Sequence, residues 1–299
     1  MGSQEGSTDS KRKALVTGAE GMLGVDVCAA LAHAGFVVDP SEIGDMDITQ
    51  PAQVHARLTA SAPAVVFHLA AYTDVDGAES NADRCFAINA EGSRNLALAC
   101  KEIGARIIYI STDYVFDGTA DKPYSEHARI NPQGVYAISK AKGEEHIAGI
   151  APNHQIVRTS WLHGIHGQKV KPNFIEAILK AAETRPSLRV VNDQRGAPTF
   201  TFDLARVLVE LAGIEARGVF HVTSAGDCTW FDLAREALKL AGRTGVKIEP
   251  ITTREYGSKA PRPAYSVLEN ARLREVGLAP MPHWRDSLKE YFRRRAARA

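Results

Sequence analysis

A tyrosine and a lysine one helical turn apart are the first candidates for chemistry in this sequence. The stretch GVYAISKAKGEE at residues 134–145 places Tyr136 four residues before Lys140, and residues four apart on a helix share one face. A tyrosine phenol has an ordinary pKa of about 10, and shifting it toward 7 requires about 4 kcal/mol of preference for the phenolate. A nearby ammonium acts in that direction. The pair therefore predicts proton exchange with a substrate, although a solvated surface pair would have the same spacing.

Another polar group follows an apolar run that predicts a buried strand. Ser111, Thr112 and Asp113 stand at the end of ARIIYIST and just beyond it. In a parallel sheet, ligands bind where the strands end. We expect the Thr112 hydroxyl to meet Tyr136 and Lys140 there and to position a substrate carbonyl oxygen.

A glycine turn follows the first predicted strand, KALVTG at residues 13–18. TGAEGMLG spaces Gly18, Gly21 and Gly24 three residues apart, at the start of a helix expected over residues 21–34. Glycines permit a tight turn and close approach of a ligand, and the first amides of the helix suit a pyrophosphate. The turn therefore predicts dinucleotide binding, with a purely structural turn as the alternative. A nicotinamide bound across the sheet edge would lie beside Tyr136, and Lys140 would donate a hydrogen bond to its ribose. The positive charge of the oxidised nicotinamide would act with Lys140 to lower the pKa of Tyr136.

The second predicted strand, FVVD at residues 36–39, ends on a carboxylate. Asp39 lies about 20 residues after Gly18, where a carboxylate can accept a hydrogen bond from the adenosine 2′-hydroxyl and repel a 2′-phosphate. No arginine stands beside it in the sequence, so Asp39 favours NADH over NADPH without excluding NADPH. Asp39 would equally serve to cap the turn into Pro40.

Composition and charge exclude several classes of protein. The 299 residues are 44% hydrophobic and carry a net charge of +1, which gives no field to attract nucleic acid or an anionic membrane. The four cysteines have no metal-site or disulfide spacing, and His163 and His166 lack accompanying metal ligands. No apolar run approaches the length of a membrane span. We expect a cytoplasmic protein that binds neither nucleic acid nor membrane, and we identify no metal site.

The elements that must position these groups alternate between strand and helix. Further buried runs at residues 64–70, 105–112 and 155–161 are separated by helical patterns, including one over roughly 82–103. This alternation predicts an α/β fold with a Rossmann-like doubly wound parallel sheet, forming a dinucleotide-binding domain at residues 13–165. Residues 166–299 predict a smaller, mixed α/β substrate-binding lobe, with some segments returning to the first sheet. Residues 1–12 are expected to be a disordered lead.

Together these motifs resemble the extended short-chain dehydrogenase/reductase superfamily, which has the same glycine turn, strand-end hydroxyl and YxxxK pattern. Within it, the chain is similar to the dTDP-4-dehydrorhamnose reductase family from about residue 13 to 290. The matching stretches include AAYTDVDGAE (70–79), STDYVFDG (111–118), RTSWLHG (158–164), NDQRGAPT (192–199) and RPAYSVL (262–268). Tyr114 stands where the related 4,6-dehydratases have a glutamate that they need to eliminate water.

The resemblance, together with the motifs above, implies two groups of site residues. Cofactor contacts would come from the glycine turn, the end of the second strand and the segment after it, the end of the third strand, and the tyrosine–lysine helix. These residues are Gly18, Gly21, Met22, Leu23, Gly24, Asp39, Asp47, Ile48, Ala70, Ala71, Tyr72, Thr73, Tyr136 and Lys140. Substrate contacts would come from the strand end and the second lobe: Thr112, Asp113, Tyr136, Trp161, Asn173, Arg195 and Arg262. Asn173 would equally cap a helix. The two arginines are expected to act as forks for phosphate oxygens.

The activity that the resemblance implies is NADH- or NADPH-dependent reduction of the 4-keto group of dTDP-4-dehydro-L-rhamnose to dTDP-L-rhamnose, an activated sugar for cell-surface polysaccharide. Tyr136 would donate the proton, with support from Lys140 and Thr112. Two alternatives stay open: a related nucleotide-sugar ketoreductase or epimerase, and a non-catalytic regulatory subunit resembling the methionine adenosyltransferase β subunit. Magnesium, which some members bind, and a homodimer also stay open.

Overall fold

A six-stranded parallel sheet forms the centre of the larger lobe. The computed structural model describes residues 12–167 and 172–298, so the lead expected over residues 1–12 lies outside the described residues except for Arg12. The strand order is β10-β5-β4-β3-β1-β2, and every pairing is parallel. The strands are β1 (Lys13–Thr17), β2 (Val37–Ser41), β3 (Val65–His68), β4 (Arg106–Thr112), β5 (His154–Thr159) and β10 (Gly218–His221). This sheet confirms the predicted Rossmann-like α/β fold.

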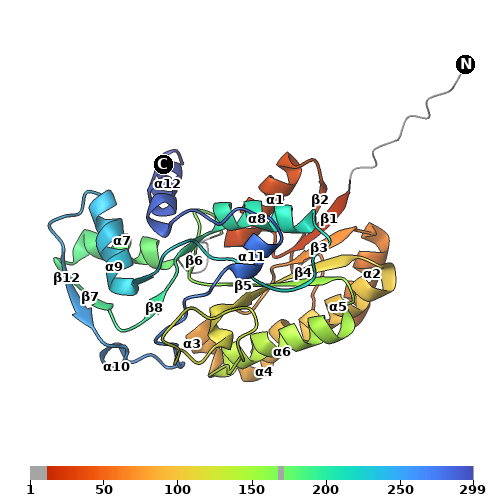
Figure 1. Ribbon diagram of the computed structural model, residues 1–299, viewed down its shortest axis with the longest axis horizontal. Helices are drawn as coiled ribbons and strands as arrows, with labels where there is room; N and C mark the ends of the chain where they lie inside the picture. The colour runs from red at the N-terminus through yellow and green to blue at the C-terminus, as the bar shows by residue number, and fades with distance from the viewer. Residues whose placement is uncertain (1–11, 168–171, 299) are drawn as a thin grey trace, which may run out of the picture.

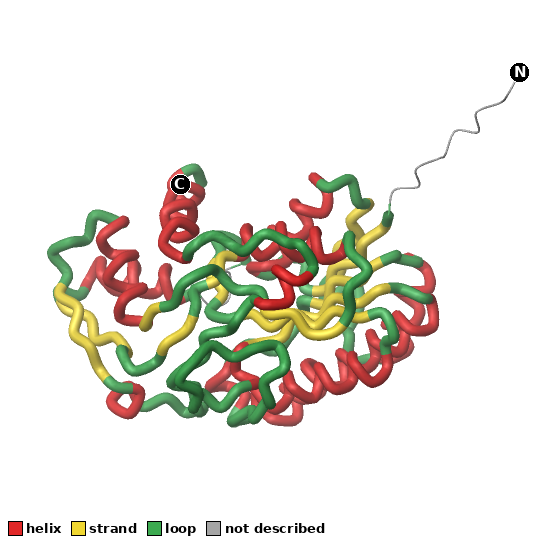
Figure 2. The backbone as a smooth tube through the Cα atoms, viewed as in Figure 1, coloured by secondary structure: helices red, strands yellow, loops and turns green. Residues whose placement is uncertain are grey.

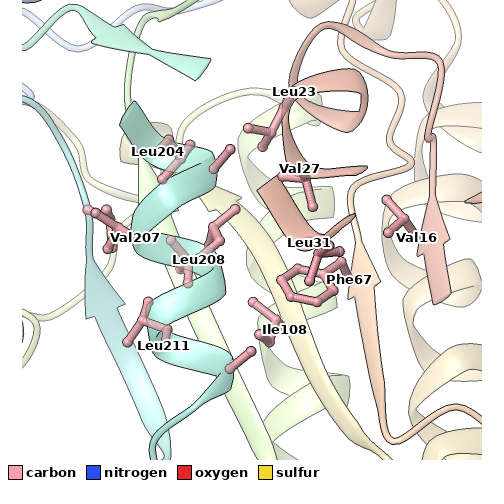
Figure 3. Packing of buried hydrophobic residues seen from close by; sticks show 14 of the residues in the cluster. Val16, Leu23, Val27, Leu31, Phe67, Ile108, Leu204, Val207, Leu208 and Leu211 are labelled. Carbon is pink, nitrogen blue, oxygen red and sulfur yellow. The ribbon is translucent and has the colours of Figure 1, made fainter. Parts of the chain in front are cut away.

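Helices cover both faces of the sheet (Figure 1). On one face, α1 (Met22–His33) and α8 (Thr201–Ala212) pack their leucines against each other and over Phe67 and Ile108 (Figure 3). The other face is covered by α2 (Pro51–Ser61), α5 (Gly92–Ile103) and α6 (Val135–Ile150). Each fully buried leucine contributes about 1.5–3 kcal/mol. These two apolar layers hold the strand ends, where the site is expected, in fixed positions.

A π-helical turn interrupts the helix that the sequence predicted over roughly 82–103. α4 (Ala82–Phe86) leads into η1 (Ala87–Glu91) and then into α5. Such turns occur often at functional sites. This one places Asn89 in the interior, where it is 1% exposed and accepts a hydrogen bond from the Tyr72 amide, which lies beyond the end of β3. Hydrophobic periodicity does not show such a turn, so the sequence predicted a regular helix.

The smaller lobe has its own core beside the sheet (Figure 2). The parallel pair β7 (Ser187–Val191) and β12 (Lys247–Ile251) lies with α7 (Phe174–Thr184), α9 (Trp230–Leu240) and α12 (Trp284–Ala296) around buried Trp284 and Tyr291. Shorter elements complete the chain: α3 (Val75–Ala78), η2 (Asp113–Val115), β6 (Leu162–His163), β8 (Arg195–Gly196), β9 (Thr199–Phe200), β11 (Cys228–Thr229), α10 (Thr253–Tyr256) and α11 (Ala271–Glu275).

Two elements from the second half of the chain belong to the larger lobe. α8 packs on α1, and β10 extends the parallel sheet beside β5. Residue 165 therefore lies near the point where the chain enters the smaller lobe, but later segments return to the first. Across the described part of the chain, no helix combines the length and apolar character that crossing a membrane requires.

Three buried histidines make the folded protein sensitive to acid. His68, His163 and His221 are at most 1% exposed, and burial lowers their pKa values to about 3, 4 and 3, respectively. In the unfolded chain each has a pKa of about 6.5. Between roughly pH 6.5 and 4 the unfolded state therefore binds protons that the folded state excludes, and the free energy of unfolding falls as the pH decreases through this window.

We expect His163→Phe to weaken this pH dependence. The new ring keeps the packing beside Phe200 and Trp230 but cannot bind a proton. The loss of unfolding free energy between pH 7 and pH 5 should therefore shrink by about 2 kcal/mol. Urea unfolding followed by tryptophan fluorescence at both pH values measures this loss, with His55→Gln at an exposed site as the control. An unchanged loss in His163→Phe would contradict the explanation.

Candidate active site

The hydroxyl, phenol and ammonium predicted from the sequence lie together at the carboxyl edge of the sheet. Thr112 is the last residue of β4, and Tyr136 and Lys140 lie in the first two turns of α6. Thr112 lies close enough to Tyr136 to lower the pKa of its phenol. Gly134, at a φ of 80°, turns the chain into α6. The structure therefore places a proton donor, a cation and a hydroxyl beside one another.

Burial controls the acidity of Tyr136. The loss of hydration raises the pKa of its phenol, the nearby Thr112 side chain opposes this rise, and the charge of Asp113 adds to it. The sequence predicted that Lys140 and the positive charge of an oxidised nicotinamide together lower this pKa toward 7. In the protein without a cofactor the pKa is raised instead, because desolvation is the largest of the effects acting on the phenol. A phenol with a raised pKa stays protonated at neutral pH, which suits a proton donor.

Lys140 is a buried cation held by backbone and aromatic contacts. It is 3% exposed, its Nζ donates to the Ile110 carbonyl at 2.7 Å, and Nζ lies 4.0 Å from the centre of the Tyr109 ring. Burial lowers the pKa of Lys140 to about 7, and the negative charge of Glu144 opposes this change. The charge on Lys140 therefore depends on a carboxylate one turn further along α6.

Glu144 joins the three elements that carry or support the candidate groups. It accepts a hydrogen bond of 2.5 Å from Ser111 on β4, and it receives two from Arg158 on β5, at 2.9 Å from Nε and 2.7 Å from the terminal nitrogen. Both partners of the ion pair are buried. The carboxylate thus fixes α6 against the strands next to Thr112. The sequence analysis missed Glu144, although its position four residues after Lys140 placed it on the same helix face.

Asn89 was also missed, and it connects the end of β3 with α6. Its Oδ1 accepts from the Tyr72 amide at 2.8 Å, while its Nδ2 donates to the Tyr72 carbonyl at 3.1 Å and to Ser139 Oγ at 3.0 Å. Ser139 in turn donates to the Tyr136 carbonyl. This chain of bonds positions the segment Ala70–Thr73, expected beside the nicotinamide, relative to Tyr136.

Asp113 and Tyr114 form the wall of the site after β4. Asp113 is 2% exposed, and burial raises the pKa of its carboxyl to about 7. Its Oδ1 accepts from Thr112 at 3.1 Å, whereas Oδ2 has no hydrogen-bond partner among the described residues. The ring of Tyr114 meets that of Tyr136 edge-on at 6.0 Å. A buried carboxyl with an unused oxygen at this position can bind a polar ligand.

The glycine turn has the tight geometry expected of a phosphate cradle. Gly18 has a φ of 66°, and a Cβ on it would lie 3.0 Å from the Ala70 nitrogen. A Cβ on Gly24 would lie 2.1 Å from the Gly18 carbonyl oxygen, so no larger residue fits there. From the other lobe, Gly167 approaches so closely that a Cβ on it would be 2.3 Å from the Met22 nitrogen. The turn is therefore as tight as a phosphate cradle requires, and the second lobe lies directly against it at Gly167.

Asp39 does not lie at the carboxyl end of its strand, so its position does not support the predicted contact with the adenosine ribose. β2 continues through Pro40 to Ser41, which leaves Asp39 two residues inside the strand. Its carboxylate binds Arg57 of α2 and the Ser61 hydroxyl. The sequence analysis found no arginine beside Asp39, because Arg57 lies 18 residues further along the chain.

The other expected adenine contacts lie between β2 and α2. Asp47 accepts hydrogen bonds from the amide and hydroxyl of Thr49 at 2.9 and 2.8 Å. Ile48 is 7% exposed, packs in the core under α5, and its carbonyl accepts from Asn95. Both residues therefore shape the segment that precedes α2.

The expected substrate residues of the second lobe all have protein partners. Trp161, at a φ of 44°, stacks on Trp230 with ring centres 3.6 Å apart. Asn173 caps α7 through a 3.1 Å bond from the Glu176 amide and also donates to the Gly164 carbonyl. Asn173 therefore has the capping role that the sequence left open.

Both predicted phosphate forks form ion pairs. Arg262 donates two hydrogen bonds to Asp76, at 3.0 and 2.7 Å, and Arg195 pairs with Asp227. Each guanidinium therefore already has a carboxylate partner, and the predicted phosphate role of the two arginines stays a prediction. Among the described residues, His, Cys, Asp and Glu form no group of three that could hold a metal ion.

Comparisons with known proteins find relatives along almost the whole chain. The family model described as the RmlD substrate binding domain matches residues 12–296. The spore coat polysaccharide biosynthesis protein SpsK of Bacillus subtilis is 41% identical, over 95% of this chain and 98% of its own. A dTDP-4-dehydrorhamnose reductase of Streptomyces griseus is 40% identical, over 93% and 92%. The crystal structure of a dTDP-4-dehydrorhamnose reductase of Bacillus anthracis in complex with NADP is 36% identical, covers 95% of this chain and 99% of that one, and has a TM-score of 0.91.

The ion pair between Glu144 and Arg158 yields a stability prediction. We expect Glu144→Gln to lower the free energy of unfolding by about 3–5 kcal/mol, because it leaves a buried guanidinium without a countercharge. Glu144→Gln combined with Arg158→Met should lose less than the sum of the two single variants. Urea unfolding measures each loss.

Glu145→Gln is the matched control, since it removes an exposed pair with Lys142 on the same helix. Exposed pairs contribute little to stability, so this variant should unfold like the wild type. Equal stability losses in Glu144→Gln and Glu145→Gln would contradict a special role for the buried pair.

Proposed function

The chain belongs to the dTDP-4-dehydrorhamnose reductase family, and from this membership we propose that it reduces the 4-keto group of dTDP-4-dehydro-L-rhamnose to give dTDP-L-rhamnose, with NADH or NADPH as the reductant. The observation that supports this most is the meeting of Thr112, Tyr136 and Lys140 at the carboxyl edge of the sheet. The glycine turn follows β1 at the same edge. A dinucleotide with its pyrophosphate at α1 can therefore extend toward Tyr136.

The side chains of this site supply the proton and hold the oxygen that receives it. A bound reduced nicotinamide supplies the hydride for C4 of the sugar. Tyr136 donates its phenolic proton to the oxygen on C4, and Thr112 orients that oxygen with a hydrogen bond. Lys140 then stabilises the phenolate left on Tyr136, because a nearby cation favours the anionic form. Glu144 favours the charged form of Lys140 that this step requires.

The wall after β4 fits ketone reduction better than elimination of water. Tyr114 stands where the resembling dehydratases have a glutamate, so this position supplies no carboxylate base. Asp113, with a pKa of about 7, can donate a hydrogen bond to a sugar hydroxyl or accept one from it near neutral pH. Trp161, already stacked on Trp230, would form an apolar floor for the sugar. A phosphate role for Arg195 and Arg262 stays a prediction, because each is paired with a carboxylate.

Cofactor contacts would come from the glycine turn, the segment before α2 and the end of β3: Gly18, Gly21, Met22, Leu23, Gly24, Asp47, Ile48, Ala70, Ala71, Tyr72 and Thr73. All four cysteines carry free thiols. Free thiols are typical of proteins in reducing compartments, which supports a cytoplasmic location.

The test of the function is oxidation of the reduced cofactor in the presence of the keto-sugar. We expect absorbance at 340 nm to fall when dTDP-4-dehydro-L-rhamnose is added with NADH or NADPH, and dTDP-L-rhamnose to accumulate. No oxidation of either cofactor, together with tight binding to a partner protein, would favour the regulatory alternative. A product with another configuration, identified by NMR, would favour a related ketoreductase.

We expect Tyr136→Phe to bind the reduced cofactor normally but to lose at least about 100-fold in turnover, the scale of a positioned proton donor. The ring and its contact with Tyr114 remain, so the variant removes only the hydroxyl. Cofactor fluorescence measures binding, and the 340 nm assay measures turnover. Tyr256→Phe, at a residue that is 60% exposed, is the control. Near-normal turnover in Tyr136→Phe would exclude Tyr136 as the donor.

A further inference from the structure

The segment after β2 lies directly beside the glycine turn. Ser41 ends β2 in register with Thr17, the last residue of β1, and the Gly18 amide donates to the Ser41 carbonyl at 3.0 Å. Ser41 is 2% exposed, and its Oγ has no hydrogen-bond partner among the described residues. In this fold the residue at the end of the second strand faces the adenosine ribose. Ser41 and the residue after it, Glu42, therefore stand at the place that faces the adenosine ribose.

Glu42 is held in place by two hydrogen bonds. Its Oε1 accepts from the Glu20 amide, within the glycine turn, at 2.6 Å. Its own amide donates to Asp45 Oδ2 at 3.0 Å. The side chain is partly buried, and its charge contributes to the raised pKa of the Cys28 thiol on α1. These contacts fix a carboxylate against the turn that would hold the pyrophosphate.

Asp39, the carboxylate that the sequence favoured, is in the wrong place for this role. Asp39 lies two positions before Ser41, a distance of about 7 Å along the strand. Arg57 and Ser61 occupy its oxygens. The same ion pair commits Arg57 to Asp39, so this cation is not free to bind a 2′-phosphate.

We propose that the Glu42 carboxylate accepts a hydrogen bond from the 2′-hydroxyl of the adenosine ribose and makes the protein select NADH over NADPH. A 2′-phosphate adds about two negative charges beside this carboxylate. At about 5 Å in a solvated cleft, the repulsion between this carboxylate and a 2′-phosphate is enough to weaken binding about tenfold. The carboxylate of Asp45, which accepts a hydrogen bond from the Glu42 amide, adds to the same repulsion. The inference rests on dinucleotide binding at the glycine turn and not on which sugar is reduced.

The test compares dissociation constants, without turnover. Isothermal titration calorimetry gives the constants for NADH and NADPH, and for the fragments 5′-ADP and 2′,5′-ADP, which lack the nicotinamide. We expect the wild-type protein to bind NADH at least about tenfold more tightly than NADPH. Glu42→Gln, which keeps a hydrogen-bond acceptor but removes the charge, should reduce this ratio to within about threefold, and the fragments should follow the same order.

The matched control at the rival carboxylate is Asp39→Asn combined with Arg57→Gln, which removes both partners of the ion pair and so leaves no free guanidinium. It should leave the ratio of the NADPH and NADH dissociation constants at its wild-type value, because Asp39 lies away from the ribose. Equal binding of NADH and NADPH by the wild type, or an unchanged ratio in Glu42→Gln, would overturn the proposal. So would a ratio that responds to the double variant and not to Glu42→Gln. NADH-selective binding without reduction of the keto-sugar would support this inference while contradicting the proposed function.

Discussion

The buried carboxylate of Glu144 is the constraint on which the candidate chemistry depends. It binds Ser111 on β4 and Arg158 on β5 while standing one turn from Lys140 on α6. The helix with the phenol and the ammonium is therefore fixed to the strand with the hydroxyl. Leaving either partner of such a pair alone in the interior is costly, so the arrangement resists displacement. The Glu144 carboxylate thus sets both the distance between Thr112 and Tyr136 and the electrostatic field at Lys140.

The rest of the fold places this fixed set at the same edge of the sheet as the glycine turn, the candidate cofactor site. The glycine turn depends on close backbone packing at Gly18 and Gly24, whereas the phenol and ammonium depend on buried polar bonds. Asn89 connects the two halves, because it binds both Tyr72 beyond β3 and Ser139 on α6. The parallel sheet brings both halves to its carboxyl edge, where ligands of this fold bind.

Local rules were enough to predict the sheet, the glycine turn and the Thr112, Tyr136 and Lys140 set, since strand ends and helical spacing follow from nearby residues. The predicted end of the second strand at Asp39 was wrong, because β2 continues through Pro40 to Ser41. β2 is an edge strand, and edge strands tolerate proline. The roles of Glu144 and Asn89 could not be predicted, because their partners are distant in sequence and one lies in a π-helical turn. The rise in the pKa of Tyr136 in the protein without a cofactor could not be predicted, because burial depends on the whole fold.

The most direct measurement of the central claim follows the hydride itself. NADH carrying deuterium at both positions of nicotinamide C4 is supplied with dTDP-4-dehydro-L-rhamnose, and the product is examined by NMR. A hydride delivered beside Tyr136 predicts one deuterium, at C4 of a sugar with the L-rhamnose configuration. A product without deuterium at C4, or with the label at another carbon, would contradict the account.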